Sequence, residues 1–150
     1  MGHPCYTPNA GQDLKRHGYR TEEWDPDFRA FIKHLEKKKP VIIGGDMNVA
    51  YTDLDIYNPD THHHSAGFTD EERSNFGLLL KDGFVDTFRQ KEPTAIAYTY
   101  WTYLFKARHY NKGWRIDYWL VSKKLAKKIK RAVIYHEQLG SDHCPVGLDL

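Results

Sequence analysis

The chain of 150 residues contains few of the features that mark secreted, disulfide-rich or membrane proteins. It has only two cysteines, Cys5 and Cys144, and neither a Cys-x-x-Cys motif nor the cysteine and histidine spacing of zinc sites. A disulfide scaffold is therefore excluded, and a reduced intracellular compartment is the default expectation. No apolar run approaches the roughly 20 residues that span a bilayer. The first residues lack the pattern of a signal peptide, so we expect no membrane partner.

A strong net charge is also missing, because the formal charge is only +2. Charge alone therefore does not identify a nucleic-acid-binding protein, and the distribution of residues must carry that case. Aromatic residues are plentiful, and many stand beside Arg, Lys or Asn, a mixture suited to stacking on sugars and bases. Half-buried strand positions are the alternative explanation for them. With no repeat, linker or low-complexity tract, residues 1–150 are expected to form one domain.

Helical and strand patterns alternate along the chain. Residues 22–38 predict a helix with Phe28, Ile32 and Leu35 on one face, and 41–43 predict a buried strand that ends in glycines. Thr69, with Glu72 three positions later, is typical of a capping box that starts a second helix. We also expect strands at 99–103, 115–121, around 133 and at 146–150, and a basic helix at 123–129. This alternation indicates an α/β fold, in which ligand sites commonly collect at strand ends.

The first candidate site follows the expected strand at 41–43. Asp46 and Asn48 lie two residues apart on one turn. A carboxylate can orient a water molecule and take its proton, and an amide can donate a hydrogen bond to a phosphate oxygen. An Asx turn that simply closes the strand explains the same spacing.

A second candidate site combines residues from two late segments. Asp142 and His143 place a hard oxygen ligand beside a titratable imidazole, and Asp117 interrupts an apolar strand pattern. A buried carboxylate needs a partner, and His143 is the natural candidate for Asp117. A satisfied loop aspartate, a half-buried histidine and an exposed strand aspartate are the alternatives.

Two conspicuous runs carry less weight. Three consecutive histidines, 62–64, cannot converge on one metal ion as residues at i and i+4 can. The basic segment 123–131 could contact DNA phosphates, but Leu125 and Ile129 lie four residues apart and favour a helix with a solvated basic face. A turn containing Tyr6 and Asn9 could contact a phosphate, although a plain turn explains it equally well.

Six motifs occur in a fixed order along the chain. They are Tyr-x-Pro-Asn-Ala-Gly, Gly-Asp-x-Asn-Val-Ala, Ala-Gly-Phe-Thr-x-x-Glu-Arg, Tyr-Thr-Tyr-Trp-Thr-Tyr, Gly-Trp-Arg-Ile-Asp-Tyr and Gly-Ser-Asp-His-Cys-Pro-Val. In this order they resemble the exonuclease III family of abasic-site endonucleases. The resemblance runs from Tyr6 to Leu150 and implies half of a four-layer α/β sandwich, with one mostly antiparallel or mixed sheet and helices on one face.

The resemblance implies roles at the scissile phosphate. Asp46 would orient or deprotonate the attacking water, with Asn48 holding water and phosphate. His143, oriented by Asp117, would stabilise charge on the phosphate, and Tyr6 would contact the same region. The implied cofactor is Mg²⁺, for which Mn²⁺ could substitute, as Lewis acid. Its implied site comprises Asp46 and Asn48, with Asp142 at the edge.

The resemblance also implies a substrate, double-stranded DNA with abasic sites. Tyr100, Leu104 and Trp114 would form an apolar pocket for a flipped-out sugar that has no base to unstack. Further DNA contacts are implied for Asn9, Arg16, Tyr103 and Arg108. The implied setting is base excision repair, in the nucleus of a eukaryote or otherwise in the cytoplasm.

Two departures from the family leave alternatives open. The family combines two similar halves, and this chain matches the C-terminal one. The resemblance therefore implies that the principal glutamate ligand of the metal is missing. It also implies an exposed apolar face, expected at Val41, Ile43 and Ile116 or their neighbours. In addition, Gln12 stands where some relatives have arginine. The chain could be an incomplete piece that binds DNA weakly, or pair with the missing half or a second copy. It could also be another phosphoesterase of the superfamily, acting on inositol lipids or RNA.

Overall fold

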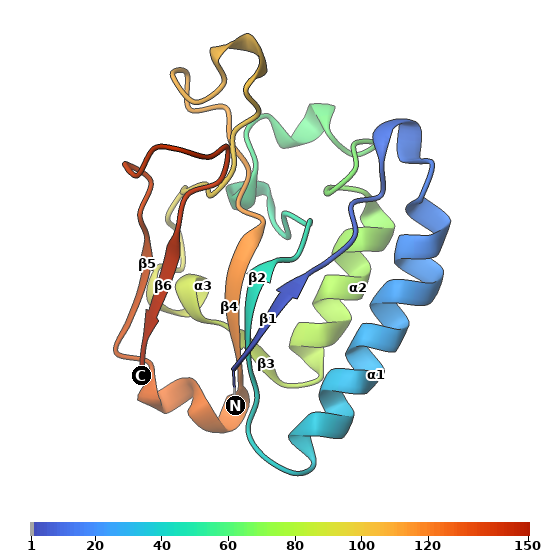
Figure 1. The fold of residues 1–150 in the computed structure, drawn as a ribbon, viewed down its shortest axis with the longest axis vertical. Helices are drawn as coiled ribbons and strands as arrows, with labels where there is room; N and C mark the ends of the chain where they lie inside the picture. The colour runs from blue at the N-terminus through green and yellow to red at the C-terminus, as the bar shows by residue number, and fades with distance from the viewer. Residues whose placement is uncertain (1) are drawn as a thin grey trace.

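A four-stranded mixed sheet forms the centre of the computed structural model, which describes residues 2–150. Its spatial order is β1-β2-β4-β3, with β1 parallel to β2 and the other neighbours antiparallel (Figure 1). The last two strands pair separately as an antiparallel ribbon. The strands are β1 (Gly2–Tyr6), β2 (Ile42–Asp46), β3 (Phe84–Asp86), β4 (Asp117–Ser122), β5 (Arg131–Ile134) and β6 (Val146–Asp149). This mixed sheet with helices confirms the expected α/β class.

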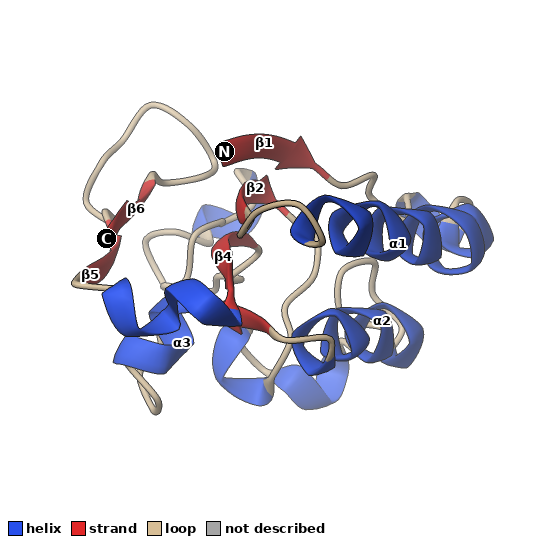
Figure 2. Cartoon of the chain, turned by 90° about the horizontal axis from the view of Figure 1, so that it is seen from below, coloured by secondary structure: helices blue, strands red, loops and turns tan. Residues whose placement is uncertain are grey.

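Two helices, α1 (Asp25–Glu36) and α2 (Asp70–Lys81), lie side by side on one face of the sheet (Figure 2). The expected start of α2 is confirmed, because the Thr69 side chain caps the helix by accepting a hydrogen bond from the backbone N–H of Glu72. The apolar faces of both helices bury the central strands in one core, which includes Ile32, Ile43, Phe76, Leu79, Tyr118 and Leu120.

Shorter helical segments connect these elements. A π-helical turn, η2 (Tyr19–Trp24), leads directly into α1, and the short α3 (Thr87–Lys91) follows β3. The expected basic helix is the 3₁₀ segment η6 (Lys123–Lys128). The remaining 3₁₀ turns are η1 (Gln12–Leu14), η3 (Asp53–Asp55), η4 (Pro59–Thr61) and η5 (Leu104–Lys106). Within the described residues, no helix is both long and apolar enough to cross a membrane.

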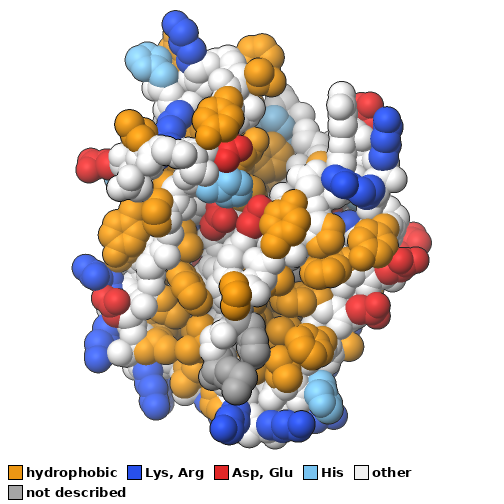
Figure 3. All heavy atoms as spheres, viewed as in Figure 1, with side chains coloured by type: hydrophobic (Ala, Val, Ile, Leu, Met, Phe, Trp, Pro, Cys, Tyr) orange, Lys and Arg blue, Asp and Glu red, His pale blue; other side chains and the backbone are white. Residues whose placement is uncertain are grey.

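Of the expected uncovered face, the three named residues, Val41, Ile43 and Ile116, were wrong. All three are buried, because Val41 and Ile43 point toward α1 and α2, and Ile116 joins a second cluster around Phe68. The opposite face of β2 has Gly44 at its centre, where the Trp119 ring lies so close that a Cβ would clash with it. Apolar side chains gather on this side of the molecule near β1 and the β5–β6 ribbon (Figure 3).

The expected strand at 99–103 is also absent. Tyr100 forms only isolated bridges, to Trp114 and to His143, instead of a ladder. The side chain of Thr99 accepts hydrogen bonds from two consecutive backbone N–H groups, those of Ile116 and Asp117, at 3.0 and 3.1 Å. The segment therefore links β4 to the residues before β6, and these links bring distant parts of the chain to one end of the sheet.

Candidate active site

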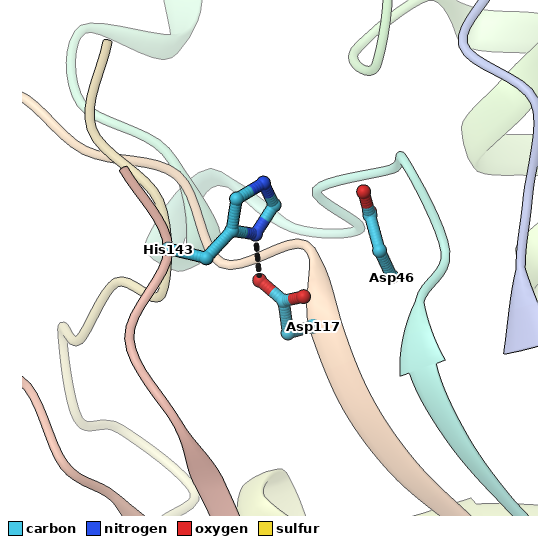
Figure 4. Close-up of side chains that lie close together, drawn as sticks. All are labelled: Asp46, Asp117 and His143. Atoms are coloured by element: carbon cyan, nitrogen blue, oxygen red, sulfur yellow. Dashed lines mark hydrogen bonds and ion pairs between the residues drawn. The ribbon is translucent and has the colours of Figure 1, made fainter. Parts of the chain in front are cut away.

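Three polar residues meet where the central strands end. Asp46, the last residue of β2, is in register with Tyr6 of β1 and with Asp117, the first residue of β4. Because neighbouring side chains in register share a face of the sheet, the two carboxylates lie close together. His143 joins them from the segment before β6 (Figure 4). Ligand atoms of Asp46, Asp117 and His143 all lie within 4.8 Å of one another.

The predicted pairing of Asp117 with His143 is confirmed. The distance from His143 Nδ1 to Asp117 Oδ2 is 2.8 Å, and both side chains are partly buried. This hydrogen bond raises the pKa of His143, against the effect of burial, which lowers it. A proton on Nδ1 facing the carboxylate leaves Nε2 available for a ligand in the cleft. The Tyr100 ring lies 5.0 Å from the imidazole and limits its orientation.

Asp46 faces this pair with both of its oxygens engaged by Asn48. The backbone N–H of Asn48 donates to Oδ1 at 2.8 Å, and its amide Nδ2 donates to Oδ2 at 3.2 Å. Burial nevertheless raises the pKa of Asp46 to about 6, with a further contribution from Asp117, while the Asn48 N–H and His143 oppose the shift. A carboxylate with this pKa can accept a proton near neutral pH.

A chain of amides fixes Asn48 itself. Its Nδ2 also donates to the carbonyl of Thr7 at 2.7 Å, and Asn9 Nδ2 donates to Asn48 Oδ1 at 3.1 Å. Asn48 has a left-handed backbone, with φ 47°, a conformation that asparagine tolerates better than most residues. The Asx turn expected as an alternative is therefore present, and the same turn orients the carboxylate and amide of the candidate site.

An open cleft of about 510 Å³ lies above these residues. Tyr100 and Trp114 line it as predicted, whereas Leu104 does not and its neighbour Phe105 does. Ile116 completes the apolar wall, and the sequence signal for it was its position two residues after Trp114, on the same side of an extended segment. Sequence reasoning also missed other lining residues, namely Tyr57, His62, Ser65, Ala66, Gly67 and Thr102.

The rim beside the cleft consists of Tyr103, Leu104 and Phe105, which are 76%, 62% and 85% exposed. Phe105 and Lys106 have left-handed backbones, with φ 57° and 51°. Arg16 is exposed on the separate loop that follows Asn9.

Arg108, predicted to contact DNA, is engaged within the protein. Its guanidinium donates to the carbonyls of His136, Gln138 and Ser141 at 2.8, 2.6 and 3.1 Å and lies over the Trp101 ring. Arg108 therefore holds the loop before His143.

Two other predicted features lie outside the carboxylate–imidazole cluster. Asp142 is adjacent to His143, but its carboxylate accepts a hydrogen bond from Ser141 and does not belong to the group that could hold a metal ion. In the histidine run, His62 contacts Ser65 while His63 lies near Asp70, so the side chains diverge as expected. For the part of the chain that the structure describes, Asp46, Asp117 and His143 form the one candidate metal group.

Comparisons with known proteins show the family to which the chain belongs. The family model described as "Endonuclease/Exonuclease/phosphatase family" matches residues 3–143. The chain is 47% identical over 146 residues to the DNA-(apurinic or apyrimidinic site) endonuclease of Dictyostelium discoideum, covering 95% of this chain and 40% of that protein. It is 46% identical over 144 residues to the exodeoxyribonuclease of Bacillus subtilis, covering 95% of this chain and 57% of that protein.

The fold is likewise shared with a solved structure. The AP endonuclease of Leishmania major superposes with a TM-score of 0.91 at 33% identity, covering 95% of this chain and 47% of that one. The chain thus spans about half the length of the relatives it matches. Because the family model covers nearly every described residue, from β1 to the candidate histidine, the chain belongs to the endonuclease/exonuclease/phosphatase family.

Proposed function

We propose that this chain carries the water-activating and phosphate-binding part of a nuclease that hydrolyses DNA phosphodiesters 5′ to abasic sites. The observation that carries the proposal is the Asp46 carboxylate facing the Asp117–His143 pair on the floor of an aromatic-walled cleft. The names of the relatives, an apurinic or apyrimidinic endonuclease and an exodeoxyribonuclease, support DNA as the substrate.

The floor residues suit attack of water on a phosphate. Asp46, whose pKa of about 6 leaves it mostly ionised at neutral pH, would orient the water and take its proton. His143, kept protonated to a higher pH by Asp117, would stabilise the negative charge that develops on the phosphate oxygens. Asn48 would hold the Asp46 carboxylate in place, because both protons of its side-chain amide are already donated, one to Asp46 and one to the carbonyl of Thr7.

A hard divalent cation, which we propose to be Mg²⁺ with Mn²⁺ as a substitute, fits the donor set only in part. Asp117 and His143 already bind each other, so Asp46 is the carboxylate left to serve as a ligand, with Asn48 beside it. Mg²⁺ commonly takes one or two carboxylates and completes its shell with water and substrate phosphate. When bound, it would act as a Lewis acid on the phosphate. Additional acidic ligands would come from outside this chain.

The walls of the cleft suit a sugar without a base. Tyr100, Trp114 and Ile116 offer apolar surface next to the floor, and an abasic nucleotide loses no base stacking when it leaves the duplex. Removal of a 3′-terminal nucleotide, one form of the exonuclease activity that the name of the Bacillus relative states, would use the same floor and is the second candidate activity.

The test uses a chimaera in which a relative supplies the half of the protein that this chain does not cover. In this chimaera, the chain replaces the 46%-identical segment of the Bacillus exodeoxyribonuclease. The chimaera is expected to incise a duplex with one abasic site when Mg²⁺ is present and not in EDTA, and Asp46→Asn should abolish incision. Incision by the Asp46→Asn chimaera at the original rate would contradict the proposal. The isolated chain, tested in parallel, distinguishes an active half from an incomplete piece that only binds DNA.

A further inference from the structure

Arg20, from the turn that precedes α1, is a buried cation underneath the cleft floor. Its side chain is only 2% exposed, and its guanidinium hydrogen-bonds to two separate segments of the candidate site. Nη1 donates to the carbonyl of Pro8 at 3.0 Å and to that of Asn48 at 3.2 Å, while Nη2 donates to the carbonyl of Met47 at 2.8 Å. One planar group therefore joins the loop after β1 to the turn after β2.

Two carboxylates hold the guanidinium in this position. Asp25 Oδ1 accepts from Nε at 2.8 Å, and Glu72 Oε2 lies 3.4 Å from Nη1. Glu72 is fully buried, and its carboxylate also accepts from the backbone N–H of Gly67 at 2.9 and 3.1 Å and from the hydroxyl of Thr69 at 2.7 Å. Since Gly67 lines the cleft, the Arg20–Glu72 pair connects its wall to both segments of the floor.

The chemistry of the contacts separates this arginine from an ordinary buried ion pair. A buried pair adds little stability compared with well-packed apolar side chains, so its geometry is the more informative property. The other buried arginine, Arg115, directs its guanidinium to the carboxylates of Asp55 and Asp86. Arg20 instead directs two nitrogens to three backbone carbonyls, a fan of donors that the single ammonium of lysine cannot reproduce.

We propose that Arg20 is a positioning residue, which with Glu72 sets the relative placement of the Asn9 and Asn48 amides. The two side chains meet at 3.1 Å, and each is anchored within a segment whose carbonyl groups Arg20 holds. What this placement does for catalysis rests on the proposed function, since Asn48 there holds the Asp46 carboxylate that would orient the water. The placement itself is a property of the folded chain and can be measured without any activity.

The test uses the side-chain amide signals of Asn9 and Asn48 in ¹H–¹⁵N spectra of the 150-residue chain. Arg20→Lys should shift or broaden both signals while the rest of the spectrum keeps the folded pattern. The control is Leu35→Ala, a truncation in α1 at a residue that packs against the core but does not line the cavity beside Arg20, which should lower stability and leave both signals in place. Unshifted signals in a folded Arg20→Lys chain would overturn the proposal.

Glu72→Gln is the second variant, should Arg20→Lys fail to fold. It preserves the volume of Glu72 but removes the charge that anchors Arg20, so the same two signals should shift less but in the same direction. A folded Glu72→Gln chain with both signals unmoved would likewise overturn the proposal. In the chimaera, Arg20→Lys should lower kcat at least tenfold with little change in KM, because misplaced groups slow the chemical step. A chimaera that lacks activity altogether, combined with shifted amide signals, would reject the proposed function and retain the positioning role.

Discussion

The floor and the rim of the cleft are built in opposite ways. On the floor, Asp46, Asn48 and His143 each have hydrogen-bond partners that fix their side chains. On the rim, Tyr103, Leu104 and Phe105 project more than 60% of their surface into solvent. Under the proposed function, the groups for the chemical step would be arranged before substrate arrives, whereas the rim would gain its contacts only from a bound partner.

The energetics of the two regions follow the same division. Donors fixed in a partly buried site stabilise developing charge without reorganising, which is where electrostatic catalysis gains most. Exposed apolar side chains grouped beside a cleft are typical of a surface that a ligand covers. Substitutions on the floor should therefore change rates, and substitutions on the rim should change binding.

The largest effect is expected from His143→Ala in the chimaera. Loss of the imidazole should lower the single-turnover rate of incision about 10²–10³-fold, the range for one electrostatic donor. The Kd for an abasic duplex should change by less than about threefold, because other groups hold the DNA backbone. His63→Ala is the matched control and should leave the rate unchanged, since His63 does not line the cleft. An unchanged rate for His143→Ala would show that the imidazole takes no part in the reaction.

A smaller effect is expected from Trp114→Ala on the cleft wall. The preference for an abasic duplex over an intact one should fall about tenfold, or about 1.4 kcal/mol, which is in the range for loss of apolar contact between one side chain and a sugar. Fluorescence anisotropy with both duplexes measures this ratio. Trp24→Ala serves as control, because Trp24 stacks on Phe28 and not on the cleft. An unchanged ratio for Trp114→Ala would show that Trp114 does not form the pocket for the abasic nucleotide.

Asp117→Asn should lower the pKa of His143, because the Asp117 carboxylate is the main cause of its increase. A raised histidine pKa means that the pair stabilises the fold fully below the ordinary value of 6.5, and that this contribution is lost as pH rises through the folded pKa. The variant should therefore unfold more easily than the parent at pH 5, by about 0.5–1 kcal/mol for a partly exposed pair, and the difference should shrink by pH 8. Imidazole NMR titration and urea unfolding at both pH values measure these effects.

The smallest effect concerns the backbone of the rim. Phe105 has φ 57°, a left-handed backbone conformation that is unfavourable for residues with a side chain. Its ring is largely exposed and makes few packing contacts. Phe105→Gly should raise the free energy of unfolding by up to about 1 kcal/mol by relieving that conformation. Tyr103, with an ordinary φ of −65°, is the matched control, and Tyr103→Gly should lower stability by about 0.5–1 kcal/mol. Equal changes in urea unfolding for the two variants would show that the rim stores no strain.

Local patterns were sufficient to predict the elements on which the site is built. The helix cap at Thr69, the strand expected at 41–43 and observed at Ile42–Asp46, and the pairing of Asp117 with His143 follow from short spacings and the need of a buried charge for a partner. The expected strand at 99–103 failed, because its aromatic and β-branched residues form single bridges in place of a ladder.

What could not be predicted depends on contacts across long distances in sequence. Arg20 resembles a solvated residue at the start of a helix, and only the fold reveals that it binds carbonyls 12, 27 and 28 residues away. Likewise, Phe105 and not Leu104 lines the cleft because the backbone at Phe105 is left-handed, and no sequence pattern predicts that conformation. Val41 and Ile43 were assigned to the wrong face, since a short apolar run does not show which side the helices cover.

One pair of substitutions in the chimaera tests the division between floor and rim most directly. Single-turnover rate and Kd are measured on the same abasic duplex for Asp46→Asn and for Leu104→Ala. The division predicts that Asp46→Asn lowers the single-turnover rate at least a hundredfold and leaves the Kd unchanged. It predicts that Leu104→Ala raises the Kd and leaves the rate at saturating enzyme unchanged. Equal losses of rate and affinity in both variants would contradict the assignment of chemistry to the floor and of recognition to the rim.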